Sequence, residues 1–125
     1  LKLLVPEPEH GDEKIKVVQS WLERNFAESI TVEQLAKQHG MSVRTLSRRF
    51  KQATSSSPLA YLQQVRIEAA KNQLATQAKS TSDIIWDVGY EDVSSFRRLF
   101  KKRTGMTMEM YRNSFINEYQ ASAMG

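Results

Sequence analysis

The stretch TVEQLAKQHGMSVRTLSRRFKQATSSSPLAYL, residues 31–62, decides the fold, because it holds start and stop signals for consecutive helices. Thr31 followed by Gln34 matches a capping box, and Gly40 is a common residue just past a helix end. Ser42 can cap the next helix. A short helix, a turn containing glycine and a second helix are the sequence pattern of a helix-turn-helix.

The same pattern returns about 50 residues later, in STSDIIWDVGYEDVSSFRRLFKKRTGMTMEMYR, residues 80–112. The matched pairs are Leu46 with Phe96, Phe50 with Phe100, Lys51 with Lys101, Thr54 with Thr104 and Tyr61 with Tyr111. Gly40 matches Gly89 after one extra residue is allowed in the second turn. Two copies are few for an array of packed helical hairpins, which usually needs three or more. The repeat therefore favours two helix-turn-helix units.

The whole chain is predicted to be all-α, with about seven helices and two homeodomain-like helix-turn-helix subdomains joined by a long linker helix, because strand signals are nearly absent. The expected helices cover about 12–26, 31–40, 42–54, 58–77, 80–89, 92–104 and 107–115. The expected divisions are a linker (1–11), the first subdomain (12–56), the connecting helix (57–78), the second subdomain (79–115) and a tail (116–125). The candidate core residues of the connecting helix are Leu59, Leu62, Val65, Ile67, Ala70 and Leu74.

Charge is unevenly distributed along the chain, whose formal net charge is +4. Residues 1–40 carry a net −2 and residues 41–112 a net +7, which indicates a polyanionic partner for the later part. With no cysteine and only two distant histidines, His10 and His39, we expect no disulfide, metal or cofactor. No apolar run could span a membrane and no signal peptide is evident, so we expect a cytoplasmic location.

The second helix of each unit presents a basic face opposite its buried face. On the first, at 100° per residue, Arg44, Arg48 and Lys51 lie opposite Leu46 and Phe50. On the second, the outward residues are Ser94, Ser95, Arg98, Lys101 and Lys102, with Arg97 at the border. Neither outward face contains an acidic residue. Arginine can bond the O6 and N7 atoms of guanine together, so this pattern predicts sequence-specific binding to double-stranded DNA.

The length of the connecting helix fits that prediction. About 20 helical residues span roughly 30 Å, and successive major grooves on one side of B-DNA lie about 34 Å apart. Two recognition helices, at about 43–54 and 93–104, are therefore expected in adjacent major grooves, with some bending of the DNA.

Residues 14–114 resemble the DNA-binding domain of the AraC/XylS family of bacterial transcription regulators. The resemblance lies in SVRTLSRRFK with SPLAYLQQVRIEAAKNQL, and in GYEDVSSFRRLFKKRTG followed by YR. It implies contacts to base edges from Arg44, Ser47, Arg48, Ser94, Arg97 and Arg98. It implies contacts to phosphates from Thr31, Ser42, Lys51, Lys101 and Lys102. The implied partners are a double-stranded DNA operator and RNA polymerase, without a membrane, and the implied role is that of a transcriptional activator or regulator.

Three residues depart from the family pattern. Ser55 stands where the family usually has glycine, so we expect a different backbone path out of the third helix. Met108 stands where proline is usual, and Trp86 replaces a small residue and is expected to fill core volume. The segment before His10 and the FRRLFKKRTG block are most similar to members with an amidotransferase-like N-terminal domain, which implies an effector-sensing domain outside this chain.

Three other classes of function are less consistent with the sequence. A module for single-stranded RNA would use aromatic residues on the outward faces for stacking, and none is present there. A helical protein-interaction module would have apolar residues at those positions. An enzyme is disfavoured because the serines at 55–57 have no histidine nearby and no glycine-rich phosphate loop occurs.

Overall fold

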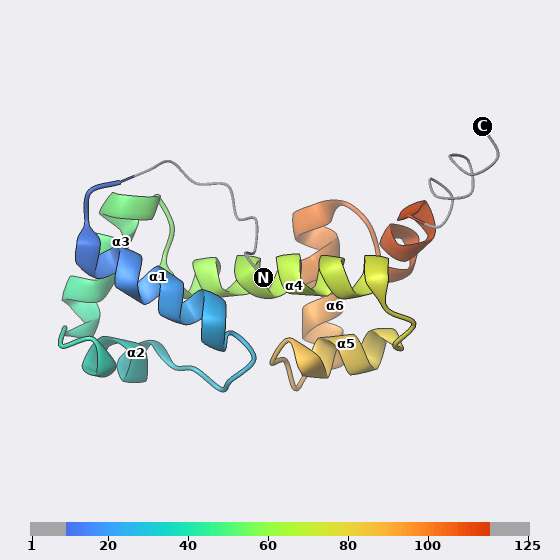
Figure 1. Ribbon diagram of the computed structural model, residues 1–125, viewed down its shortest axis with the longest axis horizontal. Helices are drawn as coiled ribbons and strands as arrows, with labels where there is room; N and C mark the ends of the chain where they lie inside the picture. Colours follow the sequence, from blue (N-terminus) through green and yellow to red (C-terminus); the bar gives the residue numbers. More distant parts are fainter. Residues whose placement is uncertain (1–9, 116–125) are drawn as a thin grey trace. The chain divides into compact units, whose positions relative to one another are not determined.

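The computed structural model describes residues 10–115, and all regular elements in this part of the chain are helices (Figure 1). The helices are α1 (Glu13–Asn25), α2 (Val32–Gln38), α3 (Val43–Thr54), α4 (Pro58–Thr76), α5 (Thr81–Asp87) and α6 (Val93–Thr104). A further helix covers residues 108–115. The all-α prediction and its seven helices are therefore confirmed. No helix in the described range is long and apolar enough to cross a lipid bilayer.

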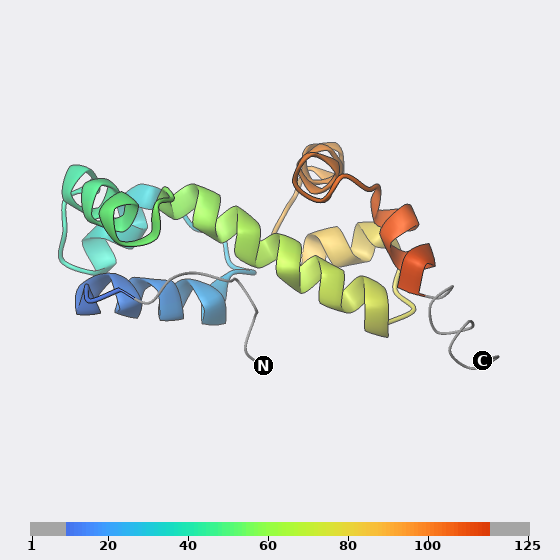
Figure 2. The same ribbon diagram turned by 90° about the horizontal axis from the view of Figure 1, so that it is seen from above.

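The chain forms two compact units, Leu1–Glu68 and Ala69–Gly125, and α4 contributes its first part to one unit and its last part to the other. In the first unit, Figures 1 and 2 both show α2 and α3 packed near α1. In the second unit, α5 packs against α6. Each unit thus contains one helix-turn-helix.

The core of the first unit is built by one apolar face from each of its helices. Its buried residues are Ile15, Val18, Leu22, Leu35, Ala36, Leu46, Phe50, Tyr61, Leu62 and Val65. Phe50 meets Tyr61 edge to face, with ring centroids 5.4 Å apart. This aromatic contact fixes the inner side of α3 against the start of α4.

The second unit repeats this packing with its own residues. Phe100 meets Tyr111 edge to face at 5.7 Å, at the positions that match Phe50 and Tyr61. Met108, which replaces the proline usual in the family, is buried and starts the last helix. An unbranched side chain can fill an irregular gap in a core, so this departure is accommodated by packing.

The predicted helix starts are confirmed by their caps. Thr31 and Gln34 form the complete capping box of α2. Ser42 caps α3, and Asp92 caps α6 in the same way through the backbone N–H of Ser95, at 3.1 Å. These side chains satisfy N–H groups that would otherwise lack an intrahelical partner.

The exits of α3 and α6 are also alike, and here the expectation for Ser55 is wrong. Ser55 adopts the left-handed conformation at φ +63°, as Gly105 does at φ +77°. Before each of them, a threonine (Thr54 or Thr104) donates to the carbonyl of the core phenylalanine one turn earlier, at 2.8 Å in both units. The serine therefore follows the backbone path of glycine, at the cost of strain on its Cβ.

Two apolar residues lie outside the core where burial was predicted. The exposed fraction of Trp86 is 55 %, and that of Leu59 is 57 %. Trp86 is rotated by about 200° from the buried Ile84 on the same helix, so it points away from the core. Leu59 lies in the first turn of α4, at the edge of a pocket described below.

One arginine in each unit holds the chain segment that leaves the unit's first helix. Arg66 is almost completely buried, and it donates to the carbonyls of Phe26 and Glu28 at 2.8 and 2.9 Å. Arg112 donates to the carbonyl of Leu74 in the last turn of α4 and to the carbonyls of Gln77 and Lys79 after it. Both guanidinium groups satisfy carbonyls at a helix end.

Candidate nucleic-acid interface

The basic face of α3 is presented by a firmly anchored helix. Leu46 and Phe50 are completely buried beneath it. Arg44, Arg48 and Lys51 are exposed, and the side chains of these three form no hydrogen bond or ion pair with another residue in the described range 10–115. Their charges are therefore available to an external anion.

The hydroxyl residues predicted to contact DNA in this unit have partial roles within the fold. Thr31 Oγ1 accepts a bond from the backbone N–H of Gln34, and Ser42 Oγ accepts one from that of Thr45, each at 3.1 Å. Ser42 also donates to the Thr45 hydroxyl at 2.9 Å. Both residues stand at helix N-termini, where the positive end of the helix dipole favours an anion.

Arg49 was not identified as an important residue from the sequence, yet it fixes α3 to the start of α1. Its Nη2 and Nε atoms donate to the two carboxylate oxygens of Asp12, at 2.7 and 3.1 Å. Asp12 is also the N-cap of α1. The hydrogen bond from Arg49 lowers the pKa of the Asp12 carboxyl, and the same bond raises the pKa of Arg49. Thirty-seven residues separate the partners, so no local pattern indicates this pair.

The basic face of α6 resembles that of α3 at several positions. Phe96 and Phe100 are completely buried, while Ser94, Arg98, Lys101 and Lys102 are exposed. Arg98 has one long hydrogen bond, from Nη2 to Ser95 Oγ at 3.4 Å. The pKa of the capping Asp92 is lowered chiefly by the backbone N–H of Ser95, so this acid remains charged beside the basic face.

Arg97 differs from the other predicted base-contact arginines, because its guanidinium is held within the second unit. Its Nη1 donates to both carboxylate oxygens of Glu109, at 3.0 and 2.8 Å, and its Nη2 donates to the Thr81 hydroxyl. The hydrogen bond from Arg97 lowers the pKa of Glu109. Glu109 was not singled out from the sequence, since it lies 12 residues from Arg97 on another helix.

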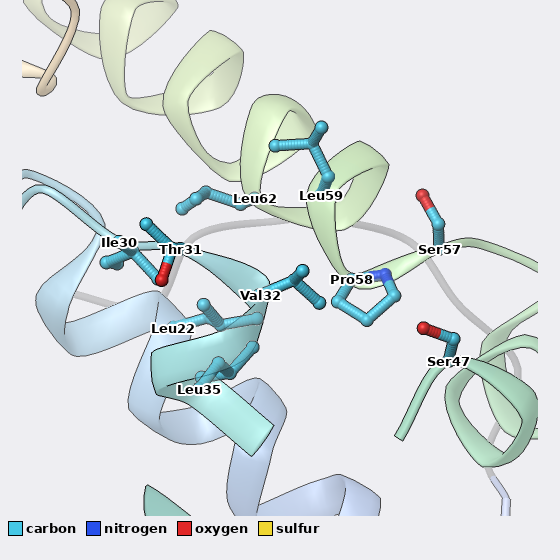
Figure 3. Close-up of a pocket in the computed structure, with 10 residues that line it drawn as sticks. All are labelled: Leu22, Ile30, Thr31, Val32, Leu35, Ser47, Ser57, Pro58, Leu59 and Leu62. Carbon is cyan, nitrogen blue, oxygen red and sulfur yellow. The ribbon is translucent and has the colours of Figure 1, made fainter. Parts of the chain in front are cut away.

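The first unit has a pocket of about 500 Å³ between α2, α3 and the start of α4 (Figure 3). Its lining is mostly apolar and includes Leu22, Leu35, Pro58 and Leu62. Ser47, predicted to contact a base, lies at this pocket and is half-buried. Ser47 is therefore less accessible than Arg44 and Arg48.

Comparison with known proteins agrees with this architecture. Residues 35–114 match a family model described as a helix-turn-helix domain. The transcriptional activator RhaS of Klebsiella pneumoniae is 35 % identical over 99 residues, which cover 79 % of this chain and 36 % of RhaS. The regulator YdiP of Escherichia coli K12 is 37 % identical over 106 residues, which cover 85 % of this chain and 35 % of YdiP.

Solved structures give the same result. The DNA-binding domain of AdpA, determined in complex with a target DNA, has a TM-score of 0.81 at 28 % identity and covers 86 % of this chain and 96 % of its own. The C-terminal domain of AraT from Geobacillus stearothermophilus has a TM-score of 0.79 at 26 % identity, covering 82 % and 86 %.

These findings define the class of protein as a two-unit helix-turn-helix domain of the kind found in transcription regulators. The chain belongs to the AraC-type helix-turn-helix family. It spans about a third of the length of the curated relatives it matches, and these relatives are named as transcriptional activators or regulators, not as enzymes.

Proposed function

We propose that this chain binds double-stranded DNA sequence-specifically and serves transcription regulation in the bacterial cytoplasm. The observation that carries the proposal is the outward face of α3. There Arg44 and Arg48 stand one helical turn apart on a helix anchored by Phe50, without partners among the described residues. A guanidinium held in this way can form two hydrogen bonds with a guanine edge.

The contacts follow from the exposure of each side chain. In the first unit Arg44 and Arg48 read bases, with Ser47 beside them. In the second unit Ser94 and Arg98 project from α6. The phosphate contacts are assigned to Thr31, Ser42, Lys51, Lys101 and Lys102. Arg97 is not assigned to this set, because Glu109 and Thr81 hold its guanidinium.

We further propose that α3 and α6 occupy adjacent major grooves on one face of the duplex. Support comes from the equal length of the two helices, 12 residues each, and from their matching caps. The DNA-binding domain of AdpA, which this chain resembles in fold, was determined in complex with a target DNA, and this supports DNA as the partner. Because the curated relatives are named as regulators of transcription, we extend the proposal to control of a promoter with RNA polymerase as a partner.

The experiment is in vitro selection from a random duplex library, repeated at two salt concentrations, followed by protection mapping of the selected site. We expect an enriched site bound at least about 10³-fold more tightly than bulk competitor DNA, with protection of two neighbouring major grooves. Equal affinity for every duplex would overturn sequence-specific binding. Protection of a single groove would overturn the two-groove arrangement.

A further inference from the structure

Arg97 joins three helical elements of the second unit. It lies on α6, its acceptor Thr81 is the first residue of α5, and its acceptor Glu109 lies in the helix of residues 108–115. Both oxygens of the Glu109 carboxylate accept from one guanidinium nitrogen. Charge-assisted hydrogen bonds of this kind are stronger than neutral ones, so the guanidinium has a defined position without DNA.

The first unit has no equivalent of this arrangement. When the two copies of the repeat are aligned, Ser47 corresponds to Arg97 and Leu59 corresponds to Glu109. The N-caps Thr31 and Ser80 also correspond, so Val32 corresponds to Thr81. These three residues line the pocket shown in Figure 3. The side chains of Val32 and Leu59 have no hydrogen-bond acceptor, so at these positions the first unit lacks the two side-chain acceptors that Arg97 has in the second unit.

The adjacent Arg98, on the same helix, is held by fewer hydrogen bonds than Arg97. It is exposed and has one hydrogen bond of 3.4 Å to Ser95. To reach DNA, Arg98 gives up little, whereas Arg97 would give up its bonds to Glu109 and Thr81. It would also leave the Glu109 carboxylate uncompensated close to a polyanion, which is unfavourable.

We infer that Glu109 determines the specificity of the second unit by keeping Arg97 out of the base-reading set. Arg97 is then a strut between α5, α6 and the last helix, and α6 reads DNA through Ser94 and Arg98. The second unit consequently discriminates fewer bases than the first, which has both Arg44 and Arg48. This inference rests on the proposed DNA binding and deepens it by assigning Arg97 a positioning role in place of base contact.

The test compares binding of variants to the selected site and to its single-base substitutions. Arg98→Ala should relax the preference at one base position, by roughly 5- to 150-fold. Arg97→Ala should leave the preference at every position within about twofold of the original protein. A relaxed position with Arg97→Ala, comparable to that with Arg98→Ala, would overturn the inference.

Glu109→Gln should release Arg97 and add a contact, seen as a steeper salt dependence by about one unit or as new discrimination at one position. Removal of any acid favours DNA binding in general, so Glu91→Gln, an exposed acid of the same unit, is the matched control. The gain specific to Glu109→Gln should vanish in the double variant with Arg97→Ala. If the gain equals that of Glu91→Gln or persists in the double variant, the gating role of Glu109 is wrong.

If Arg97→Ala unfolds the second unit, a double substitution that replaces both partners of the ion pair is tested in its place. Arg97→Ser with Glu109→Leu copies the residues Ser47 and Leu59 of the first unit, and it should likewise keep the base preferences. If the original protein selects no duplex, the proposed function fails independently of the strut. The strut is then judged by nuclear magnetic resonance titration of the Glu109 carboxyl: its pKa should rise when Arg97 is replaced, and an unchanged pKa overturns the strut.

Discussion

Replacing Ser55 by glycine should stabilise the first unit, because Ser55 adopts a left-handed conformation that disfavours a side chain. Its φ is +63°, and among the described residues it is the one residue other than glycine with a positive φ. Its backbone N–H donates to the Lys51 carbonyl at 2.8 Å, and glycine keeps that bond. The change thus removes strain without removing a helix-ending hydrogen bond.

The magnitude follows from two opposing effects. A left-handed residue with a Cβ costs roughly 1–2 kcal/mol, and Ser55→Gly removes this cost. Glycine has more conformational freedom in the unfolded chain, and this lowers the free energy of unfolding by about 0.4–1 kcal/mol. The net stabilisation should be about 0.5–1 kcal/mol, or about 2–8 °C in the midpoint of thermal unfolding for a unit of this size.

The second unit provides the reciprocal control. Gly105 has φ +77°, and a Cβ added there would meet no atom within 4 Å. Gly105→Ser should therefore destabilise the second unit by a similar amount through the backbone alone. Far-UV circular dichroism follows both units, and Trp21 fluorescence in a Trp86→Phe background follows the first, because the sequence has two tryptophans, one in each unit.

A clear result would refute this reasoning. If Ser55→Gly leaves unfolding of the first unit unchanged or lowers its midpoint, then Ser55 is not strained in solution. If Gly105→Ser is neutral while Ser55→Gly stabilises, the cause lies in Ser55's surroundings and not in the left-handed conformation.

Three further predictions concern single side chains. Arg48→Ala should weaken binding to the selected site by roughly 1–3 kcal/mol and relax one base position; equal weakening on all sequences, in a titration series, would mean a phosphate contact. Lys101→Ala should reduce the slope of log affinity against log salt by about one unit, and an unchanged slope would remove its phosphate role. Because Arg49 lowers the folded-state pKa of Asp12, the pair stabilises the fold above the ordinary carboxyl pKa, and this contribution is lost as pH falls through the lowered value. Asp12→Asn retains a good N-cap but not the charge, so urea unfolding across the acid range should show a weaker pH dependence; the same dependence as in the original protein would contradict the role of this ion pair.

The helix order and most helix ends were predictable, because the caps are local in sequence. Thr31, Ser42 and Asp92 are followed within three residues by the N–H groups that they accept from. The buried Phe50 and Phe100 followed from helical spacing alone. The fold class thus depended on signals within a few residues of each other.

The side-chain partners were not predictable, because they join distant positions. Arg49 with Asp12 and Arg97 with Glu109 each link different helices, and spacing within one helix cannot reveal them. The expectation for Trp86 was wrong because it followed from the small residue usual in the family, although helical spacing from the buried Ile84 turns Trp86 away from the core. Ser55 shows that a residue's usual preference can be overridden when the surrounding turn dictates the backbone.

The hydrogen bonds of Arg66 set a lower limit on the size of a piece of this protein that can be excised. A fragment cut just after the turn at Ser55 would keep the whole helix-turn-helix but lose the donor to the carbonyls of Phe26 and Glu28. Those carbonyl oxygens would then lose their guanidinium donor and depend on solvent for their hydrogen bonds. An autonomous first half must therefore extend through Arg66, and a C-terminal truncation of the second half has its corresponding limit at Arg112.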